Sequence, residues 1–257
     1  MKVKKYIKLL KKGIFLEAFN LIKKKPKLYL FMLLMDVCFI LGILLIGKMG
    51  NLAVQHLLRM NPIDVLISMF FYILLMMVVY SFTKFFALHF VKNMLKKTGL
   101  KLSQVGMFFL LNMVCIAFAL ALFLVLNSII LASVKEAYVR SAARFILFVL
   151  SLFTFAFISI AHSLFALGLS FKDVLKKCFK LTFNRINAYY GVFAVNALVF
   201  GVFFGLYSGL GGFLDAFLTL NFERYNALFI WFGTILLYLI QAYNRVYFYL
   251  IVKRISR

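Results

Sequence analysis

Residues 28–47 read LYLFMLLMDVCFILGILLIG, twenty consecutive residues with a single carboxylate, Asp36, near their middle. A helix of this length is ~30 Å long, which is the thickness of a bilayer's hydrocarbon core, so the stretch predicts a membrane-spanning helix. An ionised aspartate at mid-depth costs roughly 2.5–3.5 kcal/mol on insertion scales. We therefore expect Asp36 to face the interior of a helix bundle, where it either pairs with a cation or binds a proton.

The composition of the whole chain is typical of a membrane protein. Its 257 residues are 65% hydrophobic and 18% aromatic, with a mean hydropathy of +1.02. A net charge of +23 raises the question of nucleic acid. However, the basic residues lie mainly between the apolar runs, where they set topology and meet anionic lipid headgroups. We expect lipid and not nucleic acid as the partner, and the sequence identifies no protein partner.

Five further apolar runs follow the first, and together they predict an all-α, polytopic protein with six transmembrane helices arranged as three hairpins. We expect one integral membrane domain over residues 1–257. Residues 1–27 form its basic amphipathic helix, residues 28–248 the six-span bundle and residues 249–257 a basic tail. The further spans are expected at about residues 65–82, 105–126, 145–165, 189–206 and 227–248.

Two basic segments show helical periodicity. Residues 1–27 carry ten lysines, and apolar residues recur among them at spacings of three and four. Residues 170–182 open with a capping-box pattern, Ser170 followed three residues later by Asp173, and also alternate lysines with an apolar face. We expect both to lie in the membrane interface, on anionic headgroups. The alternative for the first is a basic helix that binds a partner protein.

The distribution of basic residues predicts the orientation. The segments 1–27, 83–104, 169–187 and 245–257 hold 10, 5, 5 and 4 Lys and Arg residues, a total of 24, whereas the three other gaps hold 2, 3 and 1, a total of 6. Since basic residues favour the cytoplasmic side, we expect both termini in the cytoplasm and the protein in the cell membrane.

Polar residues recur at a similar depth in several spans and predict a polar layer in the cytoplasmic half of the bundle. Such residues mark a pathway, a binding cavity or a structural ion pair. The ion-pair reading joins Asp36 to Lys84 or to Arg245. The predicted layer comprises Asp36, Lys84, Asn112, His162, Asn196, Gln241, Asn244 and Arg245.

A threefold internal repeat is one interpretation of this layer. Shifts of 76 and 160 residues align Asp36 with Asn112 and Asn196, and the repeating unit would be a basic helix followed by a two-span hairpin. Basic residues precede most cytoplasmic helix ends in any case, so chance alignment is the alternative.

Two segments resemble segments of known membrane proteins, because in each a basic helix leads into a span. They are LEAFNLIKKKPKLYLF and LKKCFKLTFNRINAYYGVF. The layout resembles uncharacterised prokaryotic six-helix membrane proteins and the membrane domain that accompanies some glycerophosphodiester phosphodiesterases. The resemblance implies a six-helix fold. It does not imply phosphodiesterase activity, because no part of these residues resembles the soluble catalytic domain.

Catalytic and metal-binding patterns are missing from the sequence. His56, His89 and His162 fall in different regions and have no carboxylate at ligand spacing. Ser159 or Ser163 with His162 is a conceivable Ser–His pair, but the spacing gives at most a shared helix face. The three cysteines, at 38, 115 and 178, show no disulfide or zinc spacing. We expect no enzyme, no metal site and no cofactor.

Gly201, Gly205 and Gly209 recur every four residues along the fifth span. This spacing is typical of close packing between membrane helices, and the alternative is a hinge or a pore-lining strip.

Two functions remain open. In the first, the polar layer forms a cavity, open to the cytoplasm, that binds or permeates a lipid headgroup or a small anionic solute, with Arg245 and Lys84 as its anion contacts. In the second, the chain is a structural or assembly protein whose basic helices gather anionic lipid or a partner. A water-accessible cavity that reaches Asp36 would favour the first, and a tightly packed interior with Asp36 paired would favour the second.

Accessibility of introduced cysteines tests the orientation, in a chain whose own three cysteines are replaced. Gln55→Cys and Asn221→Cys are expected to react with an impermeant thiol reagent added outside the cell. Lys97→Cys and Lys177→Cys are expected not to react, because the positive-inside rule puts them in the cytoplasm. External labelling at Lys177→Cys would contradict this topology.

Overall fold

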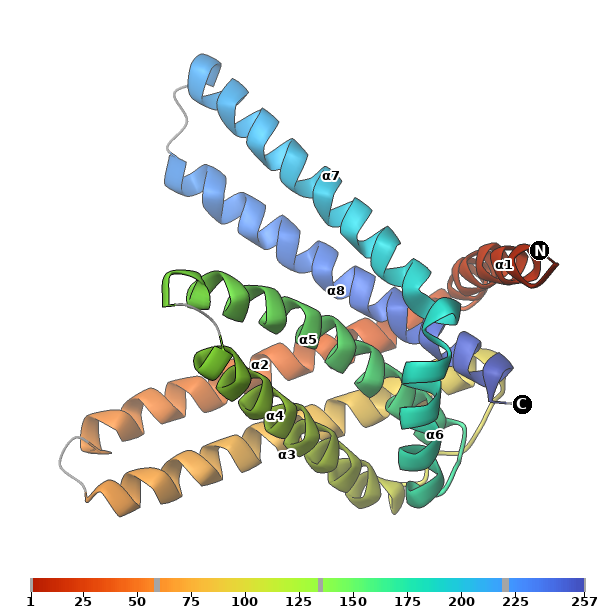
Figure 1. The fold of residues 1–257 in the computed structure, drawn as a ribbon, viewed down its shortest axis with the longest axis horizontal. Helices are drawn as coiled ribbons and strands as arrows, with labels where there is room; N and C mark the ends of the chain where they lie inside the picture. Colours follow the sequence, from red (N-terminus) through yellow and green to blue (C-terminus); the bar gives the residue numbers. More distant parts are fainter. Residues whose placement is uncertain (1, 58–60, 134–135, 219–221, 257) are drawn as a thin grey trace.

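The computed structural model describes residues 2–57, 61–133, 136–218 and 222–256, and within these ranges all regular structure is helical. Eight helices are present, and Figure 1 shows their arrangement. They are α1 (Lys2–Lys24), α2 (Pro26–Leu57), α3 (Pro62–Leu95), α4 (Gln104–Ser133), α5 (Glu136–Ala166), α6 (Phe171–Asn184), α7 (Ile186–Leu218) and α8 (Phe222–Ile255).

Six of these helices are long and apolar enough to cross a membrane, which confirms the predicted polytopic all-α protein. The apolar stretches are Pro26–Lys48, Ile63–Leu95, Leu102–Ile130, Ser141–Ala166, Ile186–Gly209 and Phe229–Ile255. Each is at least 23 residues long, so each exceeds the ~20 residues that a bilayer requires.

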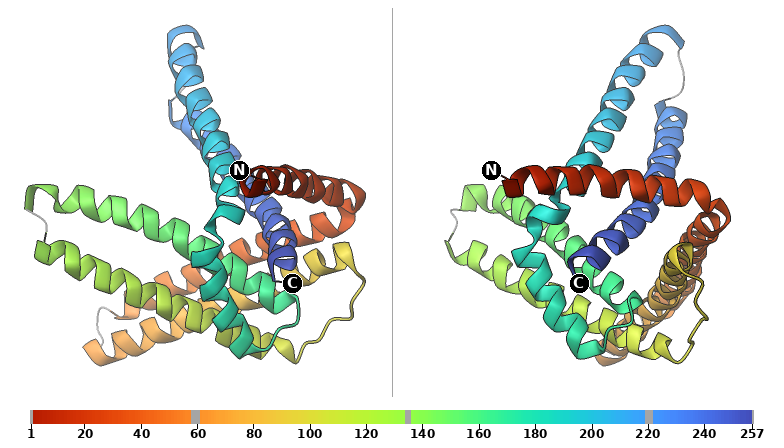
Figure 2. Two further views of the ribbon diagram at one scale, coloured as in Figure 1. Left: turned by 45° about the vertical axis from the view of Figure 1, so that its right-hand side comes forward. Right: turned by 90° about the vertical axis from the view of Figure 1, so that its right-hand side faces the viewer.

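The six spans pair in chain order as three antiparallel hairpins, α2 with α3, α4 with α5 and α7 with α8. Figure 1 shows that the hairpins converge at the end of the molecule that carries α6 and both termini, and diverge toward their tips. Figure 2 shows α1 lying across this convergent end. Most of the buried core lies at the convergent end, where α8 is enclosed from Val246 to Val252. The outer halves of the helices expose large apolar side chains, as expected of surfaces that face lipid.

Helix α1 packs on the last turns of α8. Ile14 and Ala18 are buried, the ring of Phe15 lies 4.6 Å from that of Tyr247, and the Tyr243 hydroxyl donates to the Phe15 carbonyl at 3.0 Å. The sequence predicts only that this helix is apolar on one face. The structure shows that part of this face is covered by protein.

Helix α6 begins where the capping box predicts. The Ser170 side chain accepts a hydrogen bond from the Asp173 backbone N–H at 3.3 Å, which stabilises the first turn. Val174, Cys178, Leu181 and Thr182 are buried, and α6 packs against α5. Its lysines are exposed on the opposite side.

The structure differs from the sequence-based boundaries at two places. The sequence predicts a basic tail over residues 249–257, but α8 continues to Ile255, and Tyr249, Leu250, Ile251 and Val252 are all buried. These residues are apolar or aromatic, so the helix gains from burying them. The basic segment of the second repeat unit is the end of α3 itself and is not a separate helix. The second repeat unit therefore has no separate basic helix that would correspond to α1 and α6. The threefold repeat stays a prediction.

The row of Gly201, Gly205 and Gly209 is open. A methyl group added at any of the three meets no atom within 4 Å in the described part of the chain. The expected packing of this row against another helix is thus not found there. The close approach lies instead at Gly42 on α2, where an added Cβ would lie 2.7 Å from a methyl group of Val79 on α3.

Substitution at these glycines distinguishes the two environments. Gly42→Leu is expected to destabilise the protein by about 1–3 kcal/mol, because the new side chain overpacks the interface between α2 and α3. The matched control Gly201→Leu is expected to leave the thermal unfolding temperature in detergent almost unchanged. A large loss of stability in the control would show that the glycine row is packed after all.

Candidate functional site

Asp36 is paired with two cations. Its Oδ1 accepts hydrogen bonds from Lys84 Nζ at 2.9 Å and from Arg245 Nη2 at 2.7 Å, and its Oδ2 accepts one from Arg245 Nη1 at 2.7 Å. The Arg245 contact is therefore bidentate, the strongest geometry for a carboxylate. The sequence predicts one partner or the other, and the structure shows both.

The three groups meet because their helices place them at one depth. Asp36 lies ten residues after Pro26, where α2 begins, and Arg245 lies ten residues before Ile255, where α8 ends. Ten residues correspond to ~15 Å of helix. Lys84 lies eleven residues before Leu95, the end of α3, and so reaches nearly the same level. All three helix ends lie at the convergent end of the molecule, so the triad links the first hairpin to the third.

The triad carries an unbalanced charge. One carboxylate and two cations sum to +1, and the side chains of Asp36, Lys84 and Arg245 are only 3%, 10% and 14% exposed. Lys84 also lies 5.5 Å from the ring centre of Phe39 and 5.8 Å from that of Tyr80, close enough for weak cation–π attraction. A net charge within a membrane protein is costly, and an anionic ligand would neutralise it.

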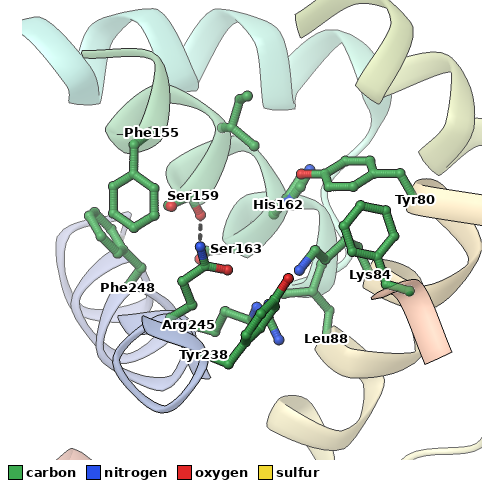
Figure 3. A pocket seen from close by; sticks show the side chains of 13 residues that line it. Tyr80, Lys84, Leu88, Phe155, Ser159, His162, Ser163, Tyr238, Arg245 and Phe248 are labelled. Carbon is green, nitrogen blue, oxygen red and sulfur yellow. Dashed lines mark hydrogen bonds between the residues drawn. The ribbon is translucent and has the colours of Figure 1, made fainter. Parts of the chain in front are cut away.

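A cavity of about 280 Å³ lies beside the triad. Figure 3 shows Lys84 from α3, Ser159, His162 and Ser163 from α5, and Arg245 from α8 around it. Apolar and aromatic side chains complete the wall, so one part of the cavity is polar and another is apolar. The lining residues are Phe39, Tyr80, Lys84, Leu88, Phe155, Ile158, Ser159, His162, Ser163, Tyr238, Gln241, Arg245 and Phe248, and none of them is acidic.

A second buried network fixes His162 at the cavity wall. His162 Nε2 donates to Asn112 Oδ1 at 2.6 Å, and Asn112 Nδ2 donates to Ser81 Oγ at 2.8 Å. Ser163 Oγ donates to the Ser159 carbonyl at 2.7 Å. In the described structure the bonds of His162 and Ser163 are thus directed away from each other, and not into a Ser–His pair.

The remaining members of the predicted layer lie in different places. Gln241 lines the cavity. Asn244 is 2% exposed, and its Oδ1 is the one buried side-chain oxygen or nitrogen without a hydrogen-bond partner in the described ranges. Asn196 is half-buried on α7 and is not among the lining residues. The structure therefore brings Lys84, His162, Gln241 and Arg245 together around one cavity and leaves Asn196 outside it.

Several cavity residues have no signal in the sequence. Tyr80, Phe39 and Tyr238 are three of the many aromatic residues of an apolar chain, and only the fold shows that they surround a charged site. The role of Ser81 is visible only in the structure, where its hydroxyl accepts a hydrogen bond from the buried Asn112 side chain. Across the described residues, no group of three or more His, Cys, Asp or Glu side chains is arranged to hold a metal ion.

Comparison of the chain with protein-family models, with curated proteins and with solved structures finds no match. The resemblance in layout to other six-helix membrane proteins therefore depends on the sequence pattern alone, and the site has to be interpreted from its own geometry.

Stability measurements test whether Asp36 is the counter-ion of two cations. Asp36→Asn leaves both cations buried and is expected to cost about 3–5 kcal/mol of unfolding free energy. Lys84→Met is expected to be tolerated, because Asp36 and Arg245 remain as a neutral bidentate pair. Arg245→Met is expected to fall between the two, since it removes two of the three hydrogen bonds. Thermal unfolding in detergent would rank the variants.

A double substitution provides the decisive comparison. Adding Lys84→Met to Asp36→Asn is expected to restore part of the lost stability, which two independent sites would not show. Asp64→Asn, at an exposed carboxylate near the start of α3, is the matched control and is expected to have no effect. Wild-type stability in Asp36→Asn would mean that Asp36 is protonated or hydrated and forms no ion pair.

Proposed function

We propose that this protein is a non-enzymatic membrane protein that binds or permeates a ligand with one anionic group, a phosphate or a carboxylate. The chain is embedded in a membrane by its six apolar helices. The excess of basic residues at the convergent end supports the cell membrane as its location, with both termini in the cytoplasm.

The observation that carries the proposal is the charge of +1 next to the cavity. Asp36 balances only one of the two cations and does not itself line the cavity. Lys84 and Arg245 both line it, and no carboxylate is among the lining residues. An ammonium can donate three hydrogen bonds and a guanidinium five, so Lys84 and Arg245 have donors beyond those that Asp36 accepts. An anion in the cavity would complete the neutralisation of the site.

The size and lining of the cavity support a small ligand group. A volume of about 280 Å³ is at the low end for small-molecule sites, so it suits a headgroup or a small solute and not a whole lipid. The hydroxyls of Ser159 and Ser163 and the amide of Gln241 add neutral polar groups, while Phe39, Phe155 and Phe248 provide an apolar wall. A phosphate or carboxylate attached to a short carbon skeleton fits this combination.

A second function is supported by a separate observation on α6. Lys172, Lys176, Lys177 and Lys180 are exposed, while the opposite face of the helix is buried against α5. A basic surface held in this way favours contact with anionic lipid headgroups and would suit a structural or assembly protein. In this alternative the triad serves only to join the hairpins.

Ligand binding by the purified protein tests the first function. Wild-type protein is expected to bind inorganic phosphate or to retain an anionic phospholipid, detected by calorimetry and by mass spectrometry respectively. Lys84→Met is expected to weaken binding about tenfold or more, because a hydrogen bond to a charged group contributes about 1.5–3 kcal/mol. Lys97→Met, at an exposed lysine away from the cavity, is the matched control.

The outcomes separate the ligands and the functions. Phosphate binding that depends on Lys84 would indicate a free solute, and Lys84-dependent retention of phospholipid alone would indicate a headgroup. Equal binding by Lys84→Met and Lys97→Met would contradict the cavity as the site. If replacing the four lysines of α6 with glutamine abolishes attachment of the anionic lipid while Lys84→Met does not, the assembly function is favoured.

A further inference from the structure

A second cavity, of about 470 Å³, lies on the convergent side of the first. It is formed by the end of α3, the segment between α3 and α4, the first residue of α4 and the end of α5. Three of its lining residues are basic or titratable, His89, Lys92 and Lys101, and none is acidic. The complete lining is Phe85, Leu88, His89, Lys92, Thr98, Gly99, Leu100, Lys101, Gln104, Phe165, Ala166 and Gly168.

Among the residues that the structure describes, Leu88 is the one that lines both cavities. On α3 the residues Lys84, Leu88 and Lys92 follow one another at intervals of four, so they lie on one face of the helix at steps of ~6 Å. Lys84 lines the first cavity and Lys92 the second. The 5% exposed side chain of Leu88 is therefore a shared wall between two cationic spaces.

The other side of the passage is formed by α5. Ser159, His162 and Ser163 line the first cavity, and Phe165, Ala166 and Gly168 line the second. Helix α5 ends at Ala166, and Gly168 adopts a φ of 90°, a conformation that favours glycine. The chain thus leaves the helical conformation at this point, beside the second cavity.

The segment that covers the second cavity is fixed by hydrogen bonds. The Thr98 backbone N–H and hydroxyl donate to Asn93 Oδ1 at 2.9 and 2.8 Å, and Asn93 Nδ2 lies 2.9 Å from His89 Nε2. Asn93 therefore ties the residues after α3 to the last turns of that helix.

We propose that the second cavity is the entrance to the first and that Leu88 is the gate between them, so that the anion arrives from the convergent end of the protein. The proposal rests on the proposed function of the first cavity. Lys92 and Lys101 attract the anion at the entrance, and Lys84 and Arg245 receive it inside. An apolar side chain between two polar spaces is a barrier to a hydrated ion until it moves aside.

The rate at which a cysteine in the inner cavity reacts with an anionic thiol reagent tests the gate. Ser159→Cys introduces this cysteine, and Cys38→Ser removes the exposed native thiol. The other two native cysteines are buried, and burial raises the pKa of the Cys178 thiol to about 12, so neither competes for the reagent. The reagent is 2-sulfonatoethyl methanethiosulfonate, added to the full-length protein in detergent.

Three changes on α3 are compared in this background. Leu88→Ala is expected to raise the labelling rate several-fold, because it opens the wall, and Leu88→Phe is expected to lower it. Val91→Ala, a truncation of a fully buried residue that lines neither cavity, is the matched control and is expected to label like the parent. If Leu88→Ala does not fold, the slower labelling of Leu88→Phe still tests the gate.

Equal rates in both Leu88 variants and in the control would overturn the gate, and would mean that the reagent reaches Ser159→Cys from between the diverging hairpins. Protection of the cysteine by inorganic phosphate or by an anionic phospholipid is measured in the same samples. Protection without any effect of Leu88 would leave the proposed function standing and remove the gate. Dependence on Leu88 without protection would support the passage and contradict anion binding.

Discussion

One carboxylate within an apolar bundle holds together three helices from opposite ends of the chain. Asp36 on α2 accepts hydrogen bonds from Lys84 on α3 and from Arg245 on α8, and this fixes the first hairpin against the third. Lipid tails are as apolar as leucine, so apolar side chains alone give little preference for one helix pairing over another. This contact positions α8, and with it the cavity between α3, α5 and α8, together with the packing of α8 on α1 and α5.

The sequence predicts that Asp36 forms an ion pair, but it does not predict that Lys84 and Arg245 both take part. A carboxylate in the middle of twenty apolar residues has few stable states, so Asp36 is identifiable without a structure. Lys84 and Arg245 are both predicted as possible partners of Asp36, because each lies near the cytoplasmic end of its predicted span. Whether one cation or both reach Asp36 depends on how the helices are rotated about their long axes. The hydrophobicity pattern does not show this rotation, because every face of these helices is apolar. The net charge of the site therefore could not be predicted from the sequence.

Other sequence patterns do not by themselves determine which residues become neighbours in the fold. Asn112 and Asn196 align in the repeat, but Asn112 lies opposite Ser81 and His162, whereas α7 stands farther from the core and leaves Asn196 partly exposed. The glycine row on α7 has the spacing of a packing motif, yet in the described residues no helix lies against it. Local signals, such as Ser170 at the start of α6, were reliable because the partner lies three residues away.

The divergence of the three hairpins gives the protein a wedge shape (Figures 1 and 2). The hairpins lie close together at the convergent end and far apart at the tips, so the leaflet that receives the tips would have to accommodate the larger area. The helix surfaces between the tips expose large apolar side chains, so this space suits lipid acyl chains. A change in lateral pressure in that leaflet therefore acts on the angles between hairpins. Because the cavity takes its walls from all three hairpins, a change in lipid packing that altered these angles would also alter the volume of the cavity.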